Sequence, residues 1–113
     1  MPPILTVRFY RTASGAEPVR HWLVGQLSPA ARKAIGADIK TVQFGWPVGM
    51  PVVRKMEPGL WEVRSNIPEG IGRVFFTLVD SEMVLLHGFV KKTQATPKAD
   101  LALAALRMKE VRA

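Results

Sequence analysis

The residues best able to do chemistry lie between positions 59 and 97, where basic side chains stand on strand-like sequence instead of on a helix. Arg64 and Arg73 fall within apolar, β-favouring runs, and Lys91 and Lys92 follow the last of these runs. Guanidinium groups bind phosphate through paired hydrogen bonds, and ammonium groups bind it as point charges. Cations placed on strands therefore predict a surface for a phosphate-bearing or acidic partner.

Side chains alternate between the two faces of a strand, so parity sorts these candidates. The expected strands are 60–66, 71–80 and 83–91. His87, Phe89 and Lys91 share one face, opposite Leu86, Gly88 and Val90. If the polar faces of the three strands coincide, one surface is lined by Glu62, Arg64, Arg73, His87 and Lys91. Phe75 and Phe89 would interleave as stacking platforms for bases, and a bulge would reverse one of these sets.

Such a surface suits RNA, whose cleavage by its own 2′-OH needs three contributions. These are a proton acceptor at the 2′ oxygen, positive charge at the developing phosphorane and in-line geometry. Arg64 and Arg73 suit the charge role. The acid–base role suits His87, Glu62 or a lysine whose pKa is lowered by neighbouring cations. Two simpler interpretations stay open: Arg64 and Glu62 can be halves of cross-strand ion pairs, and His87 can be structural.

Periodicity and turn signals predict the elements that position these residues. A strand is expected over 4–10, then a helix with a capping box from Ser14 to Glu17. Ser28 and Pro29 predict a second helix that ends near Gly45. Four sequential strands, 52–56 and the three named above, are expected to form an antiparallel meander. A helix is expected to follow over 97–111, with Thr96 as its cap. Its apolar side comprises Leu101, Ala105 and Met108. The order βαα, four strands and a helix predicts an α+β fold with the helix pair on one sheet face.

Composition limits the function further. The chain has 113 residues, a net charge of +7 and no cysteine. This length predicts one domain over 1–113, and the absence of thiols excludes a disulfide framework or a cysteine nucleophile. Two histidines are too few for a typical zinc site, so neither metal nor cofactor is expected. No apolar run reaches the roughly 20 residues that cross a bilayer, and a cytoplasmic protein is expected.

The run GLWEVRSNIPEGIGRVFFTL, followed by VLLHGFVKKTQATP, resembles the RelE/ParE superfamily of bacterial toxins. More narrowly, it is similar to the HigB-like, phage-associated branch of type II toxin–antitoxin systems. The most specific pieces are LWEVR, the arginine before the long strand, and the LLHGFVKKT–TP run. The resemblance covers nearly the whole chain and implies a RelE-like fold with about five strands.

The resemblance also implies a metal-independent endoribonuclease that cuts translated mRNA in the ribosomal A site. A helix-turn-helix antitoxin from the same operon would neutralise it, and any oligomer would form through that complex. Carried over by position, the catalytic set is Arg64, Arg73, His87 and Lys91. RNA binding is expected from Lys55, Phe89 and Lys92.

This chain departs from the family pattern at several positions. Glu62 occupies a strand face that is usually richer in basic residues, Tyr10 is the only tyrosine, and Ala95 stands where a basic residue is usual. The general acid and base are therefore not assigned. Two alternatives remain beside the ribonuclease: a ParE-like protein that poisons DNA gyrase, and a non-catalytic phage-derived protein that binds RNA or a partner.

Overall fold

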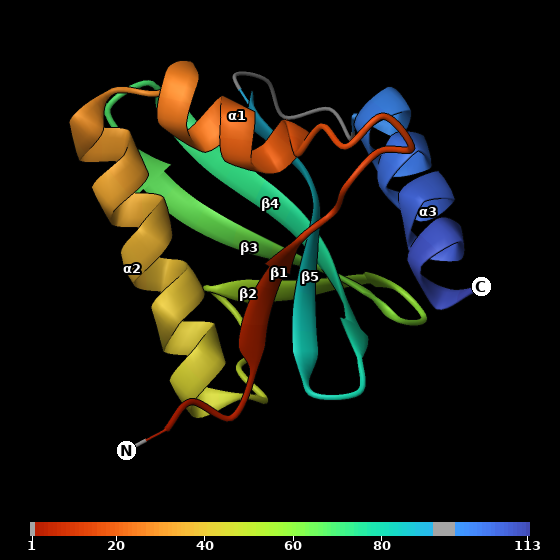
Figure 1. The fold of residues 1–113 in the computed structure, drawn as a ribbon. Coiled ribbons are helices and arrows are strands. Elements are labelled where there is room, and N and C mark those ends of the chain that lie inside the picture. The colour runs from red at the N-terminus through yellow and green to blue at the C-terminus, as the bar shows by residue number, and fades with distance from the viewer. Residues whose placement is uncertain (1, 92–96) are drawn as a thin grey trace.

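A computed structural model describes residues 2–91 and 97–113 of the chain (Figure 1). Lys92, Ala95 and Thr96, all named above, lie outside the described residues. The elements follow the expected order, with the first half comprising β1 (Thr6–Phe9), α1 (Pro18–Gly25), α2 (Pro29–Gly45) and β2 (Val53–Glu57). The second half comprises β3 (Leu60–Ile67), β4 (Gly70–Val79), β5 (Glu82–Lys91) and α3 (Lys98–Arg112).

The strands form one five-stranded sheet in the order β1-β5-β4-β3-β2. β2 to β5 pair antiparallel with their chain neighbours, which confirms the meander. β1 pairs parallel to β5, so the first and last strands are neighbours at one side of the sheet. The protein therefore has the expected α+β fold, with a mainly antiparallel sheet and a C-terminal helix (Figure 1).

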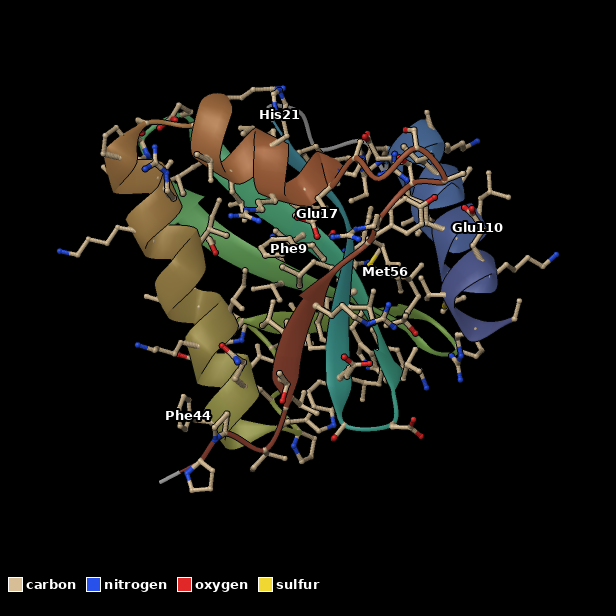
Figure 2. The ribbon with its side chains drawn as sticks, viewed as in Figure 1. Phe9, Glu17, His21, Phe44, Met56 and Glu110 are labelled. Carbon is tan, nitrogen blue, oxygen red and sulfur yellow. The ribbon has the colours of Figure 1, made fainter. Side chains whose placement is uncertain are left out.

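The two faces of the sheet have separate cores. On one face, α1 and α2 pack on Val63, Val74, Phe76 and Leu85, as expected for the helix pair (Figure 1). On the other face, α3 packs on the second core, which comprises Tyr10, Leu60, Phe75, Val84 and Leu86. Met56 of β2, labelled in Figure 2, packs against this second core. Helices therefore pack on both faces of the sheet, α1 and α2 on one face and α3 on the other.

The helix starts were predicted with unequal success. Ser28 caps α2 as expected, since its Oγ accepts the Ala31 amide hydrogen bond at 3.2 Å. The capping box at Ser14 is wrong: α1 begins at Pro18, its N-cap is Glu17, and no side chain caps it. The Ser14 hydroxyl instead bonds Thr12 within the preceding turn, at 3.0 Å. Proline suits the first helical position, so it sets the start four residues after Ser14.

The inner stripe of α3 also differs from the expectation by one position. Ala104 is fully buried, whereas the expected Ala105 is only half-buried and Leu106 is exposed. Leu101 and Met108 pack on the second core as expected. The stripe therefore advances through 101, 104 and 108, the i, i+3, i+7 spacing of a helix that lies flat on a sheet.

A bulge in β5 brings the polar strand faces together. Phe76 pairs with Leu85, but Phe75 pairs with His87, so Leu86 is an extra residue. The expectation that Leu86 lies opposite His87 is therefore wrong, because Leu86 is in the second core while Gly88 meets Trp22 on the α1 side. A bulge reverses the parity of the residues beyond it. His87, Phe89 and Lys91 consequently share the face of Arg73.

Candidate functional site

Two arginines stand directly opposite each other on neighbouring strands at the centre of the candidate site. Arg64 of β3 pairs with Arg73 of β4 in the antiparallel register. Like charges in this arrangement repel, because directly opposed side chains lie only about 5 Å apart at Cβ. The pair therefore requires a nearby negative charge.

Glu62 supplies that charge from within the protein. Its side chain is completely buried, and the Arg73 Nη1 donates to both carboxylate oxygens, at 3.2 and 3.0 Å. The Arg64 Nε lies 3.7 Å from the same carboxylate. The Glu62 carboxylate thus contacts both arginines. The expected cross-strand ion pair is real, and it coexists with the cationic surface.

The depth of these side chains differs from the simple parity expectation. The side chain of Arg73 is only 6% exposed, whereas that of Arg64 is 26% exposed. Parity places residues on a face but says nothing of depth. Of the two opposed arginines, Arg64 is therefore the accessible one, and Arg73 with Glu62 forms a buried pair that supports it.

Lys91 and Arg54 complete the accessible positive charge. Burial and the neighbouring Arg73 guanidinium lower the pKa of Lys91, with smaller contributions from Arg54 and Arg64, while Glu62 opposes the shift. Arg54 was missed in the sequence reasoning. It pairs with Glu62 across β2 and β3, so it shares the Arg64 face and is exposed. A bulge between Lys55 and Glu57 sets this register, since the Pro58-Gly59 turn alone would pair Arg54 with Val63, and so the sequence carries no signal that could have found Arg54.

Beside this cluster, the surface has a small hollow of about 120 Å³. It is lined by Pro51, Arg64, Asn66 and Ile71. The hollow lies toward the β3–β4 turn, away from the residues of the second core that α3 covers. An anion can therefore approach Arg64 from this side.

His87 occupies a different part of the same face. Its Nε2 lies 2.6 Å from the Asp100 Oδ1 in the first turn of α3. Its ring stacks on Phe89 at 5.6 Å, and Phe89 contacts the fully buried Phe75. Phe75 is therefore a core residue and not a stacking platform, whereas Phe89 is half-buried. The His87–Asp100 contact joins β5 to α3.

Distance along β5 separates His87 from the cationic cluster. His87 and Lys91 are four residues apart, which at the usual rise per strand residue is about 13 Å. Lys55 is separated in another way, since it pairs with Trp61 and so lies on the face of α2. The structure therefore brings together Arg64, Arg73 and Lys91, and it sets His87 and Lys55 apart from them.

The described residues contain no cluster of three or more His, Cys, Asp or Glu side chains that could hold a metal ion. Within the same part of the chain, no helix is long and apolar enough to cross a membrane.

Residues 22–109 match the family described as phage derived protein Gp49-like (DUF891). The chain belongs to this Gp49-like family. The matched range includes α2 and all of β2 to β5, and so every residue of the candidate site. A search of curated proteins returns no match.

Proposed function

We propose that this Gp49-like protein is the toxin of a type II toxin–antitoxin system and that it cleaves mRNA on the ribosome. One observation carries the proposal. Arg54, Arg64, Arg73 and Lys91 converge on one face, with Glu62 as their shared buried counter-ion. Four cations against one carboxylate leave a local positive surplus, which suits a phosphodiester backbone.

The proposed reaction is transfer of the phosphodiester to the neighbouring 2′ oxygen. Arg64 binds a non-bridging phosphate oxygen and stabilises the charge of the phosphorane. Lys91 in its neutral form takes the proton from the 2′-OH as the bond from the 2′ oxygen to phosphorus forms. The bond from phosphorus to the 5′ oxygen breaks, and the leaving oxygen takes a proton from water. The products are a 2′,3′-cyclic phosphate and a 5′-hydroxyl end.

The lowered pKa of Lys91 supports its role as the base. An ordinary lysine is almost wholly protonated at neutral pH, and a lowered pKa increases the fraction that can accept a proton. His87 is the second candidate for proton transfer, but its Nε2 is held by Asp100, and it lies about 13 Å along β5 from Lys91. In this proposal His87 and Phe89 contact an adjacent nucleotide.

The HigB-like resemblance implies two partners, the ribosome and a helix-turn-helix antitoxin from the same operon. A ParE-like attack on DNA gyrase is the competing activity, and a non-catalytic binding protein is the third. The gyrase and binding alternatives do not need a lysine poised for proton transfer. We therefore place the ribonuclease first.

Two adjacent residues on β2 provide a matched test. Arg54 faces the cluster and Lys55 faces the opposite side of the sheet, and both are exposed. On induction in a bacterial host, the wild type should arrest growth and produce cuts within translated mRNA. Arg54→Ala should weaken this effect, and Lys55→Ala should not. Growth arrest with intact mRNA and gyrase-linked DNA breaks would instead support the ParE-like alternative.

A further inference from the structure

We infer that Glu62 is a positioning residue of the site, whose buried carboxylate fixes the Arg73 and Arg64 guanidinium groups in the orientation that meets a phosphate. The inference rests on the proposed function in one respect only, which is that the bound phosphate belongs to RNA. It concerns a residue that touches neither substrate nor solvent, since Glu62 is fully buried.

The contacts of Arg73 show how much its orientation depends on Glu62. The Arg73 Nη1 donates two hydrogen bonds, and both run to the Glu62 carboxylate. The buried Arg73 Nε has no hydrogen-bond partner among the described residues, and neither has the Arg64 Nε. A hydrogen bond between charged groups is about twice as strong as a neutral one, and here no water competes for it. The Glu62 carboxylate is therefore the main restraint on the Arg73 guanidinium.

The opposed arginines make this restraint necessary. Arg64 and Arg73 repel each other across the two strands, and each would turn toward solvent without a counter-ion. Glu62 lies two residues before Arg64 on the same face of β3, so its carboxylate reaches both. The negative charge of Glu62 holds the two guanidinium groups close together before any phosphate binds. Without Glu62, a phosphate could bring them together only once it had bound.

The same carboxylate influences the lysine of the site. Among the residues that the structure describes, the charged groups that shift the pKa of Lys91 are Arg54 on β2, Glu62 and Arg64 on β3, and Arg73 on β4. Glu62 is the only acid among them, and it favours the protonated lysine. Removing its charge must therefore lower the pKa of Lys91 further.

These two effects separate positioning from mere support of the fold. Glu62→Gln keeps the shape of the side chain and removes one negative charge from the site. A phosphate should bind as well or better, because the local charge becomes more positive. Cleavage should fall by roughly 100-fold, the loss expected when a catalytic group is misplaced by about 1 Å, because this misplacement outweighs the larger neutral fraction of Lys91. A variant that only unfolds would lose binding and cleavage together.

The experiment compares wild type, Glu62→Gln and the matched control Glu57→Gln, which removes the same charge from the end of β2. Binding is measured with a 2′-deoxy oligonucleotide that cannot be cleaved, and cleavage with mRNA on programmed ribosomes. Lys91 is titrated by NMR with ¹³C-labelled lysine. Glu62→Gln should retain binding, lose cleavage and show a lower Lys91 pKa, while Glu57→Gln should match the wild type in all three.

The other possible results of this experiment also test the inference. If Glu62→Gln cleaves like the wild type, or if its Lys91 pKa is unchanged, the inference is wrong. If Glu62→Gln does not fold, Glu62→Asp replaces it, which keeps the charge but shortens the reach to Arg73. That variant should bind the oligonucleotide and lose cleavage, and full cleavage would overturn the inference. If the wild type cleaves no RNA, the proposed function is wrong. The Lys91 titration and the oligonucleotide binding then still test whether Glu62 positions the cations of the site.

Discussion

Replacing Arg73 by alanine is expected to destabilise the protein through the charge it leaves behind. Glu62 is fully buried, and its carboxylate would keep only Arg64, whose Nε lies 3.7 Å away. With an effective dielectric constant of about 20, the Arg73 contact at 3.0 Å corresponds to about 5.5 kcal/mol of Coulomb energy and the Arg64 contact at 3.7 Å to about 4.5 kcal/mol. The Glu62 carboxylate thus loses the stronger of its two attractions.

Measured losses for breaking a buried ion pair are about 3–5 kcal/mol, in keeping with this estimate. For a chain of this length, we expect Tm to fall by roughly 12–20 °C. The double variant Glu62→Leu/Arg73→Met should behave differently, because it removes both charges and fills the space with apolar groups. Its stability should lie within about 1 kcal/mol of the wild type or exceed it.

Urea denaturation followed by circular dichroism measures all three proteins, and the midpoint is compared at constant m-value. Arg73→Ala should show the low midpoint and the double variant a near-normal one. If the double variant is as unstable as Arg73→Ala, the cause is lost packing and not an unpaired carboxylate. This result would refute the description of Glu62 as a buried counter-ion. Because Arg73→Ala is expected to be unstable, a loss of toxicity in this variant alone cannot prove that Arg73 has a catalytic role.

Three further predictions concern stability. Tyr10→Phe removes the 2.9 Å hydrogen bond to Glu110 and should cost about 1 kcal/mol at pH 7. Burial raises the pKa of Tyr10, so the contribution of Tyr10 to stability falls as pH rises above 10.0, and the deficit of the variant should shrink there in urea titrations. Gly88→Ala should cost about 1–3 kcal/mol by calorimetry, because the new methyl group collides with the Trp22 ring; no loss would mean that α1 shifts freely. The lowered pKa of Lys91 means that the folded state binds fewer protons at this residue than the unfolded state between that pKa and 10.5. The contribution of Lys91 to stability should therefore rise with pH across this window, and Lys91→Met should lose that contribution when the two proteins are compared by urea denaturation.

The sequence predicted the order of elements because its turn signals are local. Ser28-Pro29 and Pro58-Gly59 each determine a helix start or a hairpin through the residues themselves. Parity then predicted that Arg64, Arg73 and Lys91 share one surface if the polar faces of their strands coincide. The β5 bulge was anticipated only as a possibility, since an extra residue such as Leu86 leaves no periodic signal of its own.

The depth of the site could not be predicted in the same way. Glu62 and Arg73 are buried because neighbouring strands and side chains cover them, and alternation along one strand carries no information on such cover. The contact of His87 with Asp100 joins elements whose packing is fixed only by the fold. Arg54 was missed because it depends on the register of a short strand. The structure thus changed the role of Arg73 from a surface contact to a buried support.

The most direct test of the central claim is the mapping of mRNA 5′ ends on ribosomes programmed with a defined message. Purified wild type, Arg64→Ala, Lys91→Met and the control Lys55→Ala are compared at equal folded concentration. We predict new 5′-hydroxyl ends within the translated region for the wild type and Lys55→Ala, and their loss for Arg64→Ala and Lys91→Met. Unchanged cutting by Arg64→Ala and Lys91→Met, or no cutting by the wild type, would contradict the assignment of this face as an RNA-cleaving site.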